Sequence, residues 1–394
     1  MKRELARITA LTGALSLAAS AGCAAEAPPP VAPVVAEAPA AFPPASPMGT
    51  VAEAAVPKPP PPPQEEPLPP AKPATMPLAQ GTDAPADRAL AAGDRALDAG
   101  DLVTALRSYE SARGLAPKAA APLVGLARVR VAKADVPLDY GAGKGNGEIL
   151  AARGMLKRAV TIDADSGAAE VELGRVLLLL GDAEGAMESL HRAVTVAPRE
   201  AEAHSVLGVA LLATGHADGA MAELRTAASL DMGSAARHGN LGTACLMNGK
   251  VADAVKEYEL EVRLADGDAR AHSDLGTALL AGAGDSDLAR GIGELRRAVA
   301  LDPTRATFHS NLGYALQLQG ALPDGIAEYR RALSIDPHLA SAWINLATAL
   351  AKDPKTRAEA RKALGEAQRL DPTDPRVKAN LSELDALEHG IATP

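Results

Sequence analysis

The chain has 394 residues, enough for about two to four conventional domains or one long repetitive array. Apolar residues make up 47% of it, yet it has only two Phe, one Trp and five Tyr, so its core must use small aliphatic side chains. This composition disfavours β-sandwiches, β-barrels and modules that stack nucleic-acid bases on aromatic rings. The net charge of −9 argues against nucleic acid as a partner, and two cysteines cannot form a disulfide framework.

The first 22 residues have the pattern of a secretory signal. Lys2, Arg3 and Arg7 precede the apolar stretch 8–19, which is too short to span a bilayer comfortably. Ser20-Ala21-Gly22-Cys23 resembles the lipobox of bacterial lipoproteins, although Ser20 stands where that family usually has Leu. The resemblance implies lipidation of Cys23 and an outer-membrane lipoprotein that faces the periplasm. An alternative is cleavage after Ala25, which leaves a soluble periplasmic protein.

Residues 23–85 are predicted to form a disordered, lipid-anchored linker. More than half of the 31 prolines lie between Pro28 and Pro77, and no periodic apolar face accompanies them. Polyproline II rises about 3.1 Å per residue, so the stretch could reach on the order of 150 Å. We expect a spacer that holds a domain away from a membrane. An alternative is that Pro-x-x-Pro segments recruit a domain with an aromatic groove.

From residue 86 onward the sequence repeats itself at a spacing of 34 residues, with one step of 37. Apolar residues within each repeat follow the three-and-four spacing of helices, which predicts two helices per unit. In residues 306–339, for example, Gly320 is placed to end the first helix and Pro337 to stop the second. The clearest marker of the repeat is a Leu-Gly pair, at residues 173–174, 207–208, 241–242, 275–276 and 312–313.

These registers resemble the tetratricopeptide repeat. The resemblance implies an all-α fold: a right-handed superhelical solenoid of eight helix-turn-helix units over residues 86–374, followed by a capping helix and tail at 375–394. The units begin near Ala86, Ala120, Gly167, Ala201, Ala235, Ala269, Ala306 and Ala340. One helix pair cannot bury its own apolar face, so units must stack to make a continuous core.

Four histidines occupy the same place in four units: His204, His238, His272 and His309. Adjacent helix pairs stack about 8–10 Å apart, too far for two such imidazoles to share one zinc ion without a bend. We therefore expect no metal site and no cofactor, with the imidazoles filling space where the family has Trp, as at Trp343.

Two columns of polar residues are predicted to line the concave groove. The first, Asn240, Asp274, Asn311 and Asn345, resembles the asparagine ladder in the repeat domain of O-GlcNAc transferases, which implies hydrogen bonds to a peptide backbone. The second column is Thr243, Thr277, Tyr314 and Thr348. An alternative is that the Asn side chains only solvate the groove or bond neighbouring loops. The groove positions are largely neutral, with Lys352 the one evident cation, which disfavours an Arg/Lys clamp for acidic peptide ends.

Unit two is longer by about thirteen residues, 136–148, and this insertion contains Gly141, Gly143, Gly145 and Gly147. A Walker phosphate loop needs Ser or Thr after its Gly-Lys pair, and here Gly145 follows Lys144. The insertion is therefore predicted to be a mobile loop at the edge of the array and not a nucleotide site.

These observations predict a non-enzymatic, envelope-tethered scaffold with no catalytic residues. Its partners are expected to be proteins or peptides bound in the groove, and a membrane reached through the N-terminal lipid. Assembly of an envelope complex such as a pilus or secretion pore fits the resemblance to other repeat-bearing lipoproteins. The alternative is the recognition module of a glycosyltransferase-type system that acts with a separate catalytic subunit, because residues 24–85 cannot fold into a catalytic domain and little chain follows the repeats.

Overall fold

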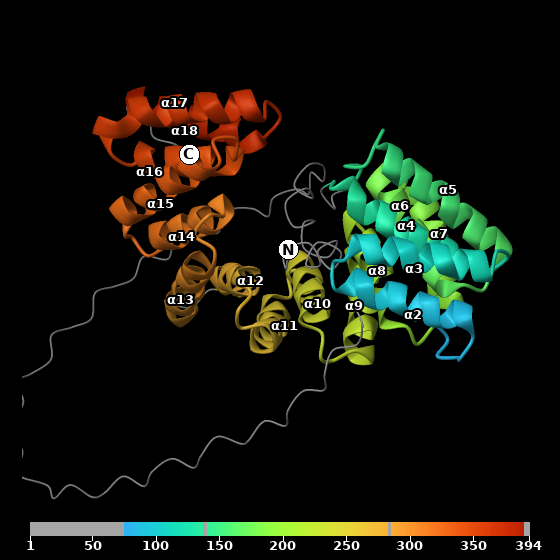
Figure 1. Ribbon diagram of the computed structural model, residues 1–394. Helices are drawn as coiled ribbons and strands as arrows, with labels where there is room; N and C mark the ends of the chain where they lie inside the picture. The colour runs from blue at the N-terminus through green and yellow to red at the C-terminus, as the bar shows by residue number, and fades with distance from the viewer. Residues whose placement is uncertain (1–74, 137–139, 283–284, 390–394) are drawn as a thin grey trace, which may run out of the picture. The chain divides into compact units, whose positions relative to one another are not determined.

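The computed structural model describes residues 75–136, 140–282 and 285–389, and all of its regular structure in these ranges is helical (Figure 1). The predicted signal segment, Cys23 and the proline-rich chain up to residue 74 lie outside the described residues. The helices are α2 (Pro85–Asp98), α3 (Leu102–Leu115), α4 (Ala121–Ala134), α5 (Gly147–Ile162), α6 (Gly167–Leu180), α7 (Ala183–Val196), α8 (Ala201–Ala213), α9 (Ala217–Leu230), α10 (Ala235–Met247), α11 (Val251–Leu264), α12 (Ala269–Leu280), α13 (Asp285–Leu301), α14 (Ala306–Leu318), α15 (Leu322–Ile335), α16 (Ala340–Ala351), α17 (Arg357–Leu370) and α18 (Pro375–His389), with a short 3-10 turn at Pro354–Thr356.

The helices from α2 to α17 form eight consecutive pairs, which we call units one to eight. The first, even-numbered helix of each pair is its A helix, and the second is its B helix. Each A helix packs against its own B helix, and each B helix packs against the A helix of the next unit. The A helices of successive units also contact one another, so together they line one continuous face. The fold is the predicted all-α solenoid of helix pairs, with α18 packed on the last pair.

Small residues let the two helices of a unit approach closely. The glycine of the Leu-Gly pair on an A helix faces a large side chain of its B helix, as Gly208 faces Leu224 and Gly313 faces Tyr329. A Cβ added at Gly208 would lie 2.5 Å from Leu224 Cγ, far inside van der Waals contact. Only glycine fits there without displacing the B helix.

The turns between the two helices of a unit also follow a repeated rule. Gly181, Gly215, Gly249 and Gly320 end their A helices with φ between +69° and +87°, the left-handed region that favours glycine. At the first of these turns, the Gly181 and Asp182 amides donate to the carbonyls of Leu178 and Leu177. The prediction that Gly320 ends the first helix of its unit is thus confirmed.

The glycine-rich insertion of unit two differs from the predicted mobile loop. Within its described part, Gly141 N donates to Leu178 O at 2.9 Å and Gly143 N donates to Leu179 O at 2.8 Å. The Tyr140 hydroxyl donates to Gly181 O at 2.7 Å. The last carbonyls of a helix lack partners within it, and the insertion satisfies those of α6. Residues 140–146 are therefore fixed to the neighbouring unit.

The prediction that residues 75–84 belong to the disordered linker is also wrong. They precede α2 and lie against the array, with Leu78 only 3% exposed. Their backbone is held by side chains of α2 and α4, which no local sequence pattern indicates. We call residues 75–82 the strap. None of the helices in the described part of the chain has both the length and the apolar character to cross a membrane.

Candidate functional site

The face lined by the A helices carries both predicted columns. The column that contains Thr243, Thr277, Tyr314 and Thr348 continues at the same helical position into the earlier units. Its members there are Asp94, Arg128, Arg175 and Val209. We call these eight positions the groove column.

In units five to eight the groove column is neutral and partly open. Tyr314 is 44% exposed and Thr277 is also exposed. Thr243 is half-buried, and its hydroxyl bonds both Gly239 O at 3.0 Å and the Tyr258 hydroxyl at 2.9 Å. Thr348 accepts a hydrogen bond from Asn380 of α18 at 3.1 Å. The open hydrogen-bonding positions of this column are thus Thr277 and Tyr314.

The predicted asparagine column is not uniform. Asn240 is 1% exposed and its Nδ2 lies 3.5 Å from Ser205 Oγ of the preceding unit, while Asn311 Nδ2 donates to Ser273 Oγ at 3.2 Å. Those two amides connect neighbouring units. Asn311 and Asn345 are only partly buried, so they keep polar atoms near the open part of the face.

Asp274, the remaining member of that column, lies beside a buried carboxyl group. Its Oδ2 accepts from Arg270 Nε at 3.3 Å, and burial raises the pKa of Asp274. Glu261 of α11 occupies a position where other units have Ala, is 4% exposed, and has no hydrogen-bond partner at Oε2. Gly239 leaves the space that the Glu261 carboxyl fills. Burial, and then repulsion from Asp274, raises the pKa of Glu261 to about 8.

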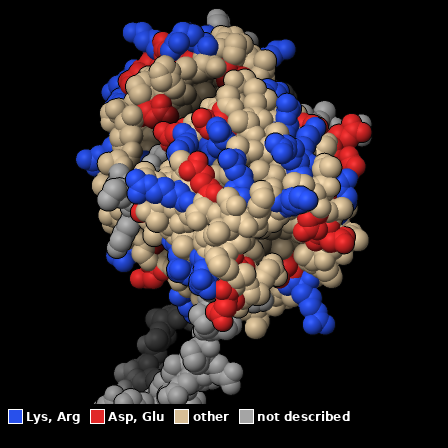
Figure 2. Space-filling view, turned by 45° about the vertical axis from the view of Figure 1, so that its right-hand side comes forward, with Lys and Arg blue, Asp and Glu red and all other residues tan. Residues whose placement is uncertain are grey.

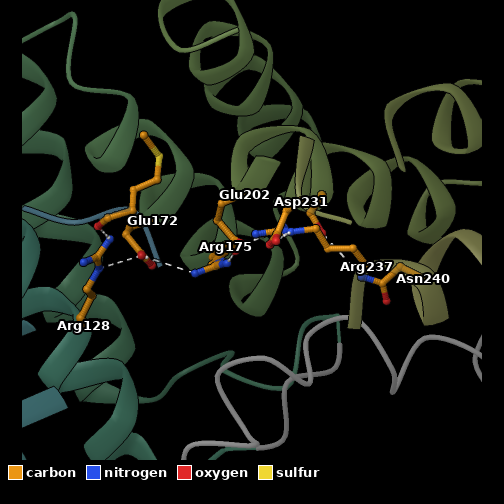
Figure 3. A network of polar contacts seen from close by, with 9 residues as sticks. Arg128, Glu172, Arg175, Glu202, Asp231, Arg237 and Asn240 are labelled. Atoms are coloured by element: carbon orange, nitrogen blue, oxygen red, sulfur yellow. Dashed lines mark hydrogen bonds and ion pairs between the residues drawn. The ribbon is translucent and has the colours of Figure 1, made fainter. Parts of the chain in front are cut away.

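In units two to five the same face carries a chain of ion pairs that the sequence analysis missed. Arg128 Nε donates to Glu172 Oε1 at 2.8 Å, and Arg175 Nη1 donates to the same oxygen at 3.4 Å. Arg175 also pairs with Glu202. Arg237 Nη1 donates to the other oxygen of Glu202 at 3.1 Å. Figure 3 shows the six charged side chains of this network: Arg128, Glu172, Arg175, Glu202 and Arg237 from A helices, and Asp231 from the end of the B helix α9.

This network corrects the expectation that Lys352 is the one evident cation of the groove. Three buried arginines lie on the A-helix face, but each is matched by a carboxylate. Burial alone would raise the pKa of Glu172, yet Arg128 and Arg175 outweigh it and lower that pKa. Because the charges are neutralised in place, the network is not a clamp for acidic peptide ends. The surface in Figure 2 likewise intersperses acidic and basic side chains with neutral stretches.

At its N-terminal end the groove column contacts a non-helical piece of chain, the strap. Leu78 N donates to Asp94 Oδ2 at 2.9 Å, and Ala79 N lies 3.4 Å from the same oxygen. Arg128 Nη2 donates to Met76 O at 3.0 Å. Asp94 and Arg128 are consecutive members of the groove column. A column predicted to line the peptide groove in later units therefore contacts a backbone in units one and two.

The strap has further anchors on α2. Gln80 N donates to Asp87 Oδ1 at 2.6 Å, and Thr82 N donates to Asp87 Oδ2. The Gln80 amide contributes most to lowering the pKa of Asp87. The Leu78 side chain joins the hydrophobic core of units one to four. The strap is thus held by its backbone and by Leu78, with the partly buried Met76 and Ala79 packed against the same core.

The four histidines share one hydrogen bond with Trp343, the bond to the carbonyl of the residue six positions earlier. Each Nδ1 lies 2.6–2.7 Å from a Glu carboxylate of its own B helix, and each Nε2 lies 2.9–3.1 Å from the carbonyl of the residue six positions earlier. Trp343 Nε1 donates to the equivalent carbonyl, Pro337 O, at 2.9 Å. Both nitrogens of each imidazole are engaged within the protein. No group of three or more His, Cys, Asp or Glu in the described ranges is arranged to hold a metal ion.

Comparison with known proteins agrees with this architecture. Models of the tetratricopeptide repeat match residues 145–210 and residues 274–340. The chain is a tetratricopeptide-repeat protein. Repeats of this family are in general protein-interaction modules, and they make this chain a protein-interaction scaffold.

One solved structure shows the same fold, and two others are similar to parts of the chain. The APC/C hetero-tetramer Cut9-Hcn1 is similar with a TM-score of 0.57 and 17% identity, over 77% of this chain and 57% of that chain. YrrB, described as a tetratricopeptide-repeat protein with an unusual peptide-binding site, matches with a TM-score of 0.37 and 19% identity over 50% of this chain and 99% of its own. PilF of Pseudomonas aeruginosa matches with a TM-score of 0.46 and 19% identity over 56% and 98% of the two chains. A search of curated proteins found no match.

The buried carboxyl next to Asp274 gives a test of this part of the face. Glu261 stays protonated in the folded repeat protein up to a pH of about 8, whereas in the unfolded chain it ionises above its ordinary pKa of 4.5. Its contribution to stability is therefore complete below pH 4.5 and is lost as the pH rises to about 8. Glu261→Gln should unfold at higher urea concentration than the wild type at pH 8.5, by about 2 kcal/mol, with a smaller difference at pH 5.

The control is Glu383→Gln, which removes an exposed carboxylate of α18. The difference in unfolding free energy between this variant and the wild type should be the same at pH 5 and pH 8.5. Equal stability of Glu261→Gln and wild type at both pH values would show that Glu261 is not buried as described.

Proposed function

We propose that this repeat protein is an envelope-tethered scaffold that binds extended segments of protein partners on its A-helix face, in units five to eight. One observation carries the proposal: two members of the groove column, Asp94 and Arg128, hold the non-helical backbone of residues 76–79. Thr277 and Tyr314 occupy the equivalent positions in units six and seven, where they are exposed.

The chemistry of this open part suits a neutral backbone. The Tyr314 hydroxyl and the amides of Asn311 and Asn345 can donate to carbonyls and accept from amides, so they do not select a charge. The Thr277 hydroxyl donates to Ser273 O at 2.8 Å and keeps its acceptor capacity for a partner amide. The exposed Tyr314 ring also offers apolar area at little cost in side-chain entropy. A partner strand that lies along the A helices would meet one such group in each unit.

The tether is the second part of the proposal. The Cys23 context and the proline-rich stretch support a lipid anchor with a spacer, which would hold the repeats near a bacterial membrane. A scaffold held in this way would assist assembly of an envelope complex by concentrating its partners near the membrane.

The groove is tested by photo-crosslinking in intact cells. A benzophenone amino acid at Tyr314 should give a discrete adduct with a partner, and Asn311→Ala combined with Asn345→Ala should reduce that adduct several-fold without loss of helicity. The matched control is Gln368→Ala, an exposed amide on the B helix α17, which should leave the adduct unchanged. An adduct that persists in the double variant would rule out recognition by these amides.

The anchor is tested by feeding cells a fatty-acid analogue. The wild type should be labelled and Cys23→Ala should not, while Cys245→Ala keeps the label because Cys245 is a buried core residue. Absence of label on the wild type, or equal label on Cys23→Ala, would contradict lipidation and leave the alternative of a soluble periplasmic protein.

A further inference from the structure

The strap contacts the array mainly through its backbone, as a bound peptide would. Its contacts with the array use mostly its own backbone: two amides to Asp94, two amides to Asp87 and one carbonyl to Arg128. Backbone recognition of this kind accepts many sequences, and a pocket for one side chain supplies the selectivity. Here that side chain is Leu78, which is 3% exposed.

The receptor groups are already oriented by the array. The Tyr109 hydroxyl donates to Asp94 Oδ1 at 2.9 Å, which leaves Oδ2 for the strap. The Arg128 guanidinium is fixed by Glu172, and its Nη2 points at Met76 O. Such groups lose little freedom when a backbone binds, which favours affinity.

The strap also reaches the next unit. A Cβ added at Gly167, the first residue of α6, would lie 3.2 Å from Met76 Cε. The occupied surface therefore covers the A helices of units one to three, and the intervening Pro77 is exposed and needs no donor partner for its nitrogen.

We propose that the A-helix face of units one to three is a second peptide site, that the strap is its intramolecular occupant, and that a partner segment of the same chemistry displaces the strap. That chemistry is an uncharged segment with one leucine that can be buried. The inference rests on the proposed function in assuming that the A-helix face binds peptides, but it concerns a different part of that face.

Covalent attachment determines how strongly the strap competes. Only residues 83–84 separate the strap from α2, which begins at Pro85. The effective concentration of the strap at the site is therefore about millimolar or more. A free peptide then binds the wild type with an affinity reduced by the small fraction of molecules whose site is empty. Weakening the strap should restore that affinity.

The test uses the full chain and a fluorescein-labelled peptide with the sequence of residues 73–83, PATMPLAQGTD. Leu78→Glu places a charge in the core pocket and should release the strap. In fluorescence polarisation this variant should bind the peptide at least ten-fold more tightly than the wild type. The matched control is Leu115→Glu, the same change at a leucine that is 54% exposed, which should bind as weakly as the wild type.

Two further arms identify the site. Asp94→Asn in the Leu78→Glu background keeps the shape of the side chain but removes its charge, and should weaken peptide binding several-fold. A peptide that carries the Leu78→Glu change should not compete with the labelled one. Equal binding by wild type and Leu78→Glu, or no binding by a folded Leu78→Glu, would overturn the proposal.

A measurement on the wild type covers the case in which Leu78→Glu does not fold. Deuterium exchange should show the amides of Leu78 and Ala79 protected, and excess unlabelled peptide should raise their exchange at least several-fold. Unchanged exchange would show that the strap is a fixed part of the fold. A crosslink at Tyr314 that depends on Asn311 and Asn345 would survive that result, so failure of this inference is separable from failure of the proposed function.

Discussion

The close approach of the two helices in each unit is the constraint on which the rest of this structure depends. In six of the eight units a glycine on the A helix lies against a large side chain of the B helix, as Gly174 does with Leu190 and Gly242 with Tyr258, and units two and eight have alanine at that position. A pair fixed in this way presents the same apolar surfaces to the units before and after it, so the units stack in one register. Because the register is constant, one position on every A helix falls on the same face, and its side chains form a continuous column.

That surface has two chemically different parts along the chain. In units two to five, buried arginines and carboxylates neutralise one another, and the strap covers the A helices of units one to three. In units six and seven the equivalent positions, Thr277 and Tyr314, are neutral and exposed. A neutral, open surface has no salt-dependent clamp to form, so backbone hydrogen bonds and apolar contact must supply its selectivity. The four histidines add no open hydrogen-bonding group to either part, because Glu side chains and loop carbonyls engage their ring nitrogens, as at His238.

The repeated features were predictable from the sequence, because each follows from a spacing of 34 residues. That spacing placed the helix pairs, the left-handed glycine at residue 320 and the columns at Asn311 and Tyr314. The partners of these side chains were not predictable in the same way. The insertion in unit two shifts Arg175 out of register with Arg128, so the sequence did not show that they share one column. The contact of Asn240 with Ser205 joins two different units, and the repeat spacing alone does not indicate it. The strap was missed because Pro77 and its neighbours read as linker, while the groups that hold it, Asp94 and Arg128, come from helices that follow it in the chain.

The most direct test of this account is the urea unfolding of two matched variants, Gly208→Ala and Gly154→Ala. Both replace a helical glycine, and alanine is the better helix former by about 1 kcal/mol. Nothing lies within 4 Å of a Cβ added at Gly154, so that variant should be more stable than the wild type by up to about 1 kcal/mol. At Gly208 the added methyl group would push against Leu224, so that variant should be less stable than the wild type by about 1–3 kcal/mol. Equal stabilisation by both substitutions would contradict the claim that close contact between paired helices sets the register of the array.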